Sequence, residues 1–401
     1  MSYNKWTVAL AAAGVVSVAS VVNAEEHANS VMTALSTTTL SGYVDTSAQW
    51  NFGTGNNRLP DYKFGGSSKA DGFNLNVVQL RLEKPLSEEE WAAGYRVDLW
   101  AGPDANVLGT QSTLATGSSD FAIRQAYVAL RAPVGNGLDF KVGVFDSIVG
   151  YESVESGSNP NYTRSYGHSI EPQTHTGVLM SYRFSDLVSA SVGIANTTGP
   201  SINSRDVSSD EGQVKSESSK TYMASVAVTA PDNLSFLSGS TLYAGIVNGF
   251  NENESKQDYD ENSTSYYIGG TVATPVAGLR LGAALDVLEV HRIGGETWSV
   301  GGYASYQATE KLSLHFRGEY LRDRGDQKFF FDSVGSTNPD RTMALTATAQ
   351  YDLWKNVISR LELRWDHSLS GQGVWGGTIG SEDTGTKKNE VMLAANIIYK
   401  F

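Results

Sequence analysis

The chain closes with the stretch EVMLAANIIYKF, residues 390–401. Alternate residues of this stretch, from Val391 to Phe401, are apolar or aromatic, and the residues between them include the polar Asn396 and Lys400. A repeat of two residues indicates a β-strand whose two faces meet different surroundings. No polar tail follows the aromatic residue, so we expect Phe401 itself to be part of the strand.

The same alternation recurs along the whole chain. The stretch LELRW at 361–365, for example, places its apolar residues on one side and Glu362 and Arg364 on the other. We expect about sixteen such strands, at 38–50, 73–84, 91–101, 121–132, 138–147, 174–184, 187–197, 220–230, 240–250, 264–274, 279–289, 296–308, 311–322, 341–353, 357–368 and 389–401. Each has roughly ten residues or a few more, the length that a tilted strand needs to cross a lipid bilayer.

The connections between these segments alternate in length. Short turns such as PVGNG, PVAG and WKN are followed, with the brief 290–295 as an exception, by long links at 51–72, 102–120, 148–173, 198–219, 251–263, 323–340 and 369–388. Such sorting is typical of barrels in an outer membrane. The sequence therefore predicts an all-β fold, a transmembrane antiparallel up-and-down β-barrel of about 16 strands with short periplasmic turns and long extracellular loops.

A soluble β-helix or a pair of β-sandwiches is the alternative, because both also contain alternating strands. However, the succession of Arg360, Glu362, Arg364 and Asp366 on one strand face needs water on that side. Strands in hydrocarbon cannot leave an edge unpaired, so we expect the last strand to pair with the first. A closed barrel of this size encloses a water-filled lumen rather than a packed core.

The first residues have the pattern of an export signal. A single lysine precedes an apolar stretch, and Ala24 ends a small-residue cleavage pattern before acidic residues. We expect a cleaved signal peptide at 1–24, a short periplasmic segment at 25–37 and the barrel at 38–401. An uncleaved membrane anchor is the alternative, but the apolar stretch is shorter than a spanning helix needs.

The composition narrows the class of protein further. The chain has no cysteine, which in an exported protein argues against a disulfide framework, haem attachment or a zinc–thiolate site. Its formal net charge is −13, so we expect no nucleic-acid partner, since phosphate binding needs clustered Lys and Arg. The 19 tyrosines and 8 tryptophans suit a protein with aromatic side chains at the membrane–water boundary.

Several stretches carry a resemblance to a known family. They are TTLSGYVDTSAQWNFGTG (38–55), KADGFNLNVVQLRLEKPL (69–86), the segments 121–152 and 159–179, and the terminal IIYKF. Together they resemble bacterial outer-membrane porins, and more narrowly the OmpL-like β-barrel porins. The resemblance implies an outer-membrane location among lipid, passive diffusion of small hydrophilic solutes and ions, and permits a homotrimer. It also implies that the barrel-insertion machinery reads the terminal strand, with Tyr399 and Phe401.

In porins the loop after the fifth strand folds into the lumen and narrows it, and here that loop is 148–173. Its candidate site residues are Glu152, Glu155, Arg164, His168 and Glu171. Backbone at membrane depth is tolerated where it lines a wet cavity, so the resemblance implies a constriction loop. An external loop that closes the top of the barrel is the alternative.

The strand alternation also assigns charged side chains to the lumen. The basic residues that we expect there are Arg96, Arg131, Lys141, Arg317, Arg360 and Arg364. The acidic residues are Asp45, Asp98, Asp286, Glu319, Glu362 and Asp366. A basic wall that faces an acidic loop would put a transverse field across the narrowing and tune which ions pass. Alternatively, these residues form cross-strand pairs that stiffen the wall, and the overall acidity then predicts a mild preference for cations.

Other residue patterns predict no further chemistry. The acidic stretch 251–262 lacks the glycine and the spacing of a calcium loop, so we interpret it as a solvated surface loop. The six histidines show no metal-binding pattern, and no GxSxG occurs. We therefore expect a channel that is not an enzyme, without cofactor or metal. The alternatives are a channel selective for sugars or anions, lined by Tyr43, Trp100, Tyr127 and Tyr303, or a non-conducting barrel that acts as adhesin, scaffold or enzyme.

Overall fold

The computed structural model of the protein describes residues 38–401, except for 54, 112–118, 206–216, 251–261, 292–294, 325–339, 372 and 378–384. The expected signal peptide at 1–24, the segment 25–37 and nearly all of the acidic stretch 251–262 lie outside the described residues. The described part of the chain consists mainly of strands.

The strands are β1 (Thr39–Asn51), β2 (Gly72–Lys84), β3 (Ala93–Ala101), β4 (Phe121–Ala132), β5 (Leu138–Asp146), β6 (Thr174–Arg183), β7 (Val188–Ala195), β8 (Thr221–Thr229), β9 (Thr241–Phe250), β10 (Asn262–Ala273), β11 (Leu279–Val290), β12 (Gly295–Gln307), β13 (Leu312–Arg324), β14 (Arg341–Trp354), β15 (Val357–Ser368) and β16 (Asn389–Lys400). Their ends lie within two residues of the predicted ones. The helices are α2 (Pro103–Leu108) and α3 (Tyr166–Ile170), with 3-10 turns η2 (Ser67–Lys69), η3 (Ser156–Ser158) and η4 (Ser235–Leu237). Among the residues that the structure describes, no helix combines the length and the apolar character needed to traverse a membrane.

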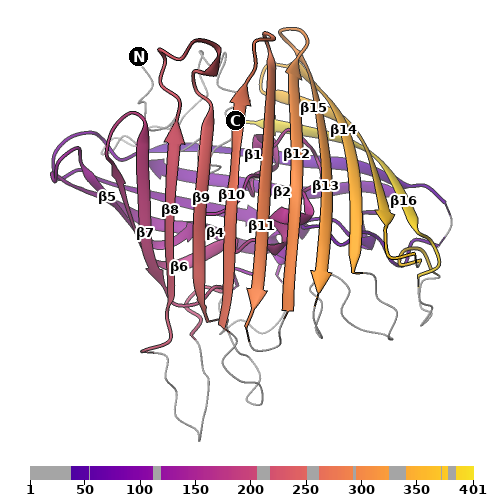
Figure 1. The fold of residues 1–401 in the computed structure, drawn as a ribbon, viewed down its shortest axis with the longest axis horizontal. Helices are drawn as coiled ribbons and strands as arrows, with labels where there is room; N and C mark the ends of the chain where they lie inside the picture. Colours follow the sequence, from indigo (N-terminus) through magenta and orange to yellow (C-terminus); the bar gives the residue numbers. More distant parts are fainter. Residues whose placement is uncertain are drawn as a thin grey trace, which may run out of the picture.

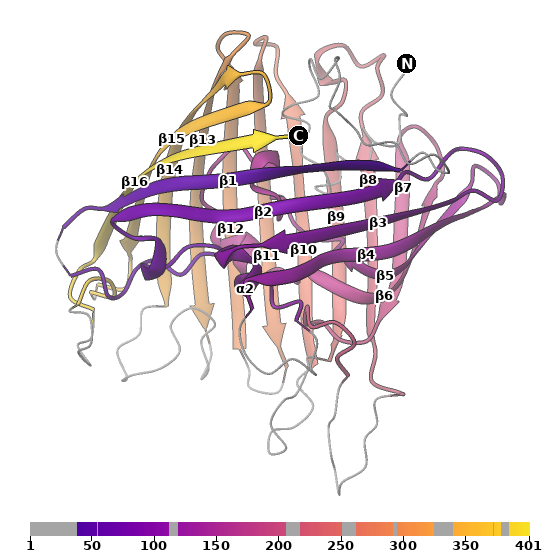
Figure 2. The same cartoon turned by 180° about the vertical axis from the view of Figure 1, so that it is seen from behind.

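The strands form one closed antiparallel barrel (Figures 1 and 2). Each strand pairs with its neighbours in the sequence, and β1 pairs with β16 to close the ring. The near and far walls run in clearly different directions in Figure 1 because the strands of a barrel tilt against its axis. The predicted all-β barrel with a seam between its first and last strands is confirmed.

The seam between β1 and β16 explains why the final aromatic residue belongs to the wall. The Phe401 N–H donates to the Gly42 carbonyl at 3.0 Å, and the Gly42 N–H donates to the Phe401 carbonyl at 2.9 Å. A side chain on Gly42 would overlap the Phe401 ring and the carbonyl of Gln79, so only glycine allows this close approach. Phe401 therefore continues the strand pairing to the last residue.

The two faces of each strand meet different surroundings, as β15 illustrates. Leu361 and Leu363 on the outer face are 54% and 49% exposed, whereas Glu362 and Arg364 on the inner face are 0% exposed. Exposed apolar side chains recur on the outer faces of the other strands. A barrel in hydrocarbon presents such an apolar outer band to the lipid.

The interior is less polar than the water-filled lumen that we predicted. One buried apolar cluster lines the inner faces of β5 to β12 and includes Phe145, Val247 and Tyr267. A second cluster around Trp100 and Ile398 includes residues of α2. These side chains are buried because connections between the strands fold into the barrel and pack against them. Part of the inner face is therefore a packed core, which corrects the expectation of a wall lined only by water.

Candidate pore constriction

The segment 148–173, called the constriction loop below, connects β5 to β6 and lies inside the barrel. Its helix α3 packs against the inner faces of β11, β12 and β13. Side chains of β15 and β16 donate to its backbone, since Arg360 binds two carbonyls at 3.0 and 2.6 Å and Lys400 binds one at 2.9 Å. On the other side of the barrel, the Tyr243 hydroxyl donates to the Ile148 carbonyl. The loop therefore contacts the wall on several sides of the lumen.

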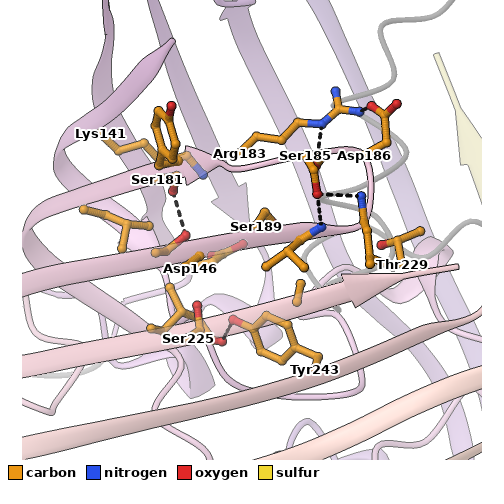
Figure 3. A pocket seen from close by; sticks show the side chains of 18 of the residues that line it. Lys141, Asp146, Ser181, Arg183, Ser185, Asp186, Ser189, Ser225, Thr229 and Tyr243 are labelled. Carbon is orange, nitrogen blue, oxygen red and sulfur yellow. Dashed lines mark hydrogen bonds and ion pairs between the residues drawn. The ribbon is translucent and has the colours of Figure 1, made fainter. Parts of the chain in front are cut away.

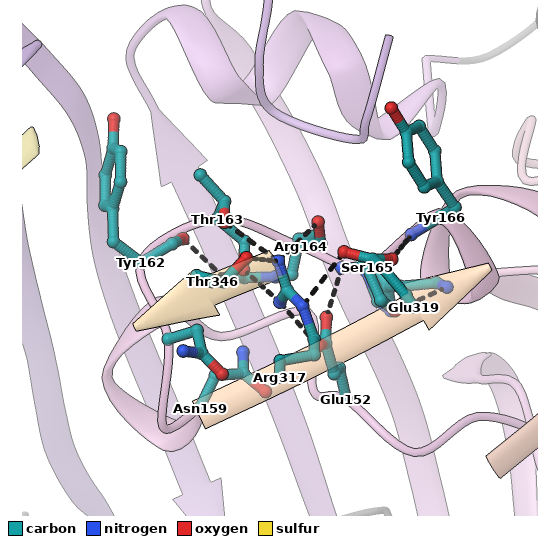
Figure 4. Close-up of polar contacts among 12 residues, drawn as sticks. Glu152, Asn159, Tyr162, Thr163, Arg164, Ser165, Tyr166, Arg317, Glu319 and Thr346 are labelled. Carbon is teal, nitrogen blue, oxygen red and sulfur yellow. Dashed lines mark hydrogen bonds and ion pairs between the residues drawn. The ribbon is translucent and has the colours of Figure 1, made fainter. Parts of the chain in front are cut away.

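Arg317 on β13 is the centre of the contact between loop and wall (Figure 4). Its Nη1 lies 2.9 Å from Glu152 Oε1 and donates to the Thr163 carbonyl at 2.7 Å. Its Nη2 donates to the Thr163 hydroxyl at 2.9 Å and to the Arg164 carbonyl at 3.2 Å, and its Nε donates to Glu319 at 3.1 Å. The side chain has no exposed surface. Charge-assisted hydrogen bonds, which are the strong ones, thus hold the loop in dry surroundings.

Two wall carboxylates bind the backbone of the loop. Glu319 accepts from the Tyr166 N–H at 2.6 Å. Glu362 accepts from the N–H groups of Tyr162 and Thr163 at 2.6 and 3.0 Å. Backbone N–H groups that are folded away from water need such partners. The strand alternation that turns these carboxylates inward therefore supplies acceptors for the irregular backbone of the loop.

The connection between β1 and β2 adds a second layer over the constriction loop. The Tyr62 ring lies 4.2 Å from the guanidinium of Arg364, which itself donates to the Arg164 carbonyl at 2.8 Å. The Lys63 N–H donates to the Ser169 hydroxyl at 2.8 Å. We did not predict this layer, because no local pattern in 51–72 distinguishes an inward loop from an outward one.

A second charged cluster lies on β2, β3 and β4, where Arg81, Arg96 and Arg124 surround Asp98. Arg124 Nη1 and Arg96 Nη2 lie 2.6 and 2.8 Å from Asp98 Oδ2. Glu155 of the constriction loop pairs with Arg81 and, at 3.1 Å, with Arg96. The side chains of Arg81, Arg96 and Glu155 keep 17–18% of their surface exposed, unlike the covered arginine on β13. This cluster is therefore a charged part of the site that solvent still reaches.

Sequence reasoning missed two residues of this cluster, Arg81 and Arg124. Arg81 stands between two leucines in β2, and that alternation is a signal that could have found it. Arg124 is harder to find, because the register between β3 and β4 shifts at Asp98 and leaves Arg124 as an extra residue. Such a bulge re-aims a side chain, so a strict repeat of two counted back from the end of β4 puts Arg124 on the wrong face.

The remaining predicted wall residues are spread over the inner face. Arg131 pairs with Asp139 at 2.6 Å. The Lys141 ammonium lies 5.0 Å from the centre of the Tyr127 ring. Asp45 accepts hydrogen bonds from two asparagine side chains at 2.9 and 2.6 Å. These residues do not converge on a single site.

The loop and the β13–β15 wall differ from the predicted arrangement. We expected a basic wall to face an acidic loop across the narrowing. Instead, the charged wall residues bind the loop directly and are covered by it; they are Arg317, Glu319, Arg360, Glu362, Arg364 and Asp366. Within the loop, Arg164 Nη2 donates to the Val154 carbonyl at 2.8 Å, while His168 and Glu171 lie near Asp286 of β11. The reason is that a loop folded into the lumen must satisfy its own backbone, and the wall charges are the available partners.

A hollow on the inner face of β5 to β9 lies beside Ile148 of the loop (Figure 3). Hydroxyl groups line it, those of Ser181, Ser189, Ser191, Ser225 and Thr229. Two of them, on Ser181 and Ser191, are 2.7 Å apart. Lys141 and the ion pair of Arg183 with Asp186 complete its polar lining. This side of the lumen therefore presents hydroxyl groups beside apolar side chains such as Leu179 and Ala227.

Most of the guanidinium and carboxylate groups gathered here are paired with each other or bind the backbone of the loop. Within the described part of the chain, no group of three or more histidine or carboxylate side chains is placed to hold a metal ion. The geometry is that of a loop held inside a barrel by charged wall residues on one side and by apolar packing on the other.

Solved structures and one family resemble the chain. DcaP, an outer membrane channel of Acinetobacter baumannii, shares 12% identity at a TM-score of 0.58, over 91% of this chain and 97% of that one. The anion-selective porin from Comamonas acidovorans shares 11% identity at a TM-score of 0.57, over 91% of this chain and 99% of that one. Salmonella typhi OmpF in complex with daunomycin shares 15% identity at a TM-score of 0.57, over 91% of this chain and 97% of that one. At such identities these likenesses establish the fold alone. No curated protein matches the chain by sequence. The family described as "Putative beta-barrel porin-2, OmpL-like" matches residues 37–401, and the chain therefore belongs to this family of outer-membrane β-barrel porins.

Proposed function

We propose that the protein is a passive channel through which small hydrophilic solutes and ions diffuse, with a lumen that the constriction loop narrows. The observation that carries this proposal is the anchoring of the loop to inward-facing side chains of β13 and β15, above all through Arg317. A loop so fastened reduces the cross-section and leaves the barrel wall intact. The family and the fold point to a channel rather than to an enzyme.

The partly exposed charged cluster on β2 to β4 supports a weak ion preference. Arg81, Arg96 and Arg124 carry three positive charges, and their partners Glu83, Asp98, Asp146 and Glu155 carry four negative ones. Because these charges nearly cancel locally, we expect the size of a solute to matter more than its sign. The net charge of −13 then adds a mild preference for cations.

We further infer that the chain assembles as a homotrimer and that its terminal strand directs insertion. OmpT of Vibrio cholerae, 11% identical with a TM-score of 0.54, was solved in a trimer form. Deleting Phe401 should lower the yield of assembled barrel, because the deletion removes both hydrogen bonds to Gly42 at the seam. An unchanged yield of heat-modifiable barrel would rule out this role of Phe401. Cleavage after Ala24 would leave Glu25 as the first residue in N-terminal sequencing.

Conductance across a planar bilayer with a salt gradient tests the proposed function. Purified, folded protein should add stepwise conductance, and the reversal potential should be small and of the sign of cation preference. Heat-denatured protein in the same detergent is the control. A folded barrel that never conducts would favour a scaffold or adhesin instead. Current blocked by one solute and not by others of equal size would favour a substrate-selective channel.

A further inference from the structure

Two carboxyl groups meet where the constriction loop touches β11. Glu171 directly follows α3, Asp286 lies at mid-strand, and their side chains are within hydrogen-bonding contact. The residues are only 9% and 5% exposed. A methyl group on Gly167 would overlap the Asp286 carboxylate, and one on Gly150 would overlap the Glu171 carboxylate. The backbone of the loop is therefore pressed against both acids.

Among the described residues around this pair, none offers an unpaired positive charge that could balance the two carboxylates. The loop contributes Tyr151 and Glu152, and the charge of Glu152 is already paired with Arg317 at 2.9 Å. From β10, Tyr267 stands directly opposite Asp286 in the strand register. Apart from His168, the groups that surround the pair are thus an acid and two tyrosines.

His168 is the nearest basic group, with its Nδ1 3.3 Å from Glu171 Oε2. Burial and the positive charges of Arg164, Lys63 and Arg317 lower the pKa of His168 well below its usual value. His168 is therefore neutral near neutral pH. It cannot balance two ionised carboxylates.

Two buried carboxylates in contact repel each other unless they share a proton. Burial, with Asp286 and Glu152 close by, raises the pKa of Glu171 well above its usual value. With one proton bound, the contact becomes an O–H···O⁻ hydrogen bond, a short and strong type. Without it, two negative charges face each other in dry surroundings.

We propose that Glu171 and Asp286 form a proton-binding site that fastens the constriction loop to β11, so that loss of the shared proton loosens the loop. The inference rests on the proposed function, since the loop is the narrow part of that channel. The docked loop binds the proton more tightly than a released loop does. Docking is therefore fully stabilised at low pH and loses this stabilisation as the pH rises through the raised pKa of Glu171.

Single-channel recording over a range of pH tests the site. As the pH rises through the raised pKa of Glu171, the shared proton is lost, and we expect current transitions of the wild-type channel to become several-fold more frequent. Glu171→Gln and Asp286→Asn should stay steady over the whole range, because an amide donates the same hydrogen bond at every pH. Glu289→Gln, which removes a carboxylate from the same strand away from the pair, should keep the wild-type profile.

A second measurement does not require conductance. Stability against guanidinium chloride should fall with rising pH for the wild type and for Glu289→Gln, but much less for Glu171→Gln. If the wild type is equally steady and equally stable at both ends of the range, or if Glu171→Gln retains the wild-type pH profile, the proposed site is wrong. A channel that conducts at every pH without these changes refutes this inference alone. A folded barrel that never conducts refutes the proposed function, and the stability profile then still decides whether the pair binds a proton.

Discussion

The constriction loop is held between two walls of opposite chemistry. On β13 and β15, Arg317, Glu319 and Glu362 have fully covered side chains and bind the loop through charge and hydrogen bonds. Across the barrel, the loop residues Ile148 and Val149 pack in an apolar cluster with side chains of β8 to β10. The same short segment therefore depends on both kinds of interaction.

The difference shows that the position of the loop and the exclusion of water around it are controlled by separate interactions. A guanidinium has N–H groups in a fixed fork, so its contacts define where the loop lies. Apolar packing has no direction and mainly excludes water. The charged wall is also the more vulnerable one, because removing one partner leaves the others buried without compensation. We expect substitutions on the two walls to differ accordingly.

The largest effect should come from Arg317→Met. This change leaves Glu152 buried without its cation and leaves Glu319 with only Arg364, 3.5 Å away. It should lower the free energy of unfolding by about 3–5 kcal/mol. Guanidinium chloride unfolding in lipid vesicles measures the loss. The matched control is Arg341→Met, because Arg341 is 46% exposed and pairs with Asp340 at the surface, so its loss should be below about 1 kcal/mol. Equal losses for both variants would contradict the contrast between covered and exposed charges.

A smaller effect should come from Tyr243→Phe on the apolar wall. The substitution keeps the ring and leaves the Ile148 carbonyl without its donor, which should cost about 1–3 kcal/mol of unfolding free energy. Tyr222→Phe is the control, since Tyr222 is 57% exposed on the outer face of β8. The same unfolding assay should find this control close to the wild type. A neutral Tyr243→Phe would mean that packing alone holds the loop on this side.

Combining the two changes sharpens the contrast further. If the loop docks as one unit, Arg317→Met already weakens the contact at Ile148. Tyr243→Phe should then cost less in that background, with a coupling energy of about 1 kcal/mol in a double-mutant cycle. Strictly additive losses would instead mean that the two walls hold separate parts of the loop.

The smallest effect concerns ion preference. Arg96→Gln removes a partly exposed positive charge and should raise the cation-to-anion permeability ratio by roughly twofold, a modest change because salt screens charges that solvent reaches. Arg364→Gln is the comparison, because that side chain has no exposed surface. It should reduce stability and leave the reversal potential nearly unchanged. Equal shifts for the two variants would contradict the assignment of Arg96 to the accessible cluster.

Strand alternation predicted which residues of the wall face inward, with few errors. Glu362 and Arg364 face inward as expected because successive side chains of a strand point to opposite faces. The set of predicted wall residues omitted Arg124, because a bulge breaks the repeat there. Strand alternation also predicted that Arg317 faces open water, because the alternation of a strand contains no information about a loop that covers its inner face.

By itself, the sequence determined the closed barrel, its sixteen strands and the place of Phe401 at the seam. Alternation and turn length are local properties of the sequence, and alternation directly sets which side chains face lipid. Only the tertiary structure decided which inward-facing charged side chains stay accessible to solvent and which carboxyl groups contact each other. The contact of Tyr166 with Glu319 spans 153 residues of chain. That of Glu171 with Asp286 likewise depends on the path of a folded loop, which no local repeat encodes.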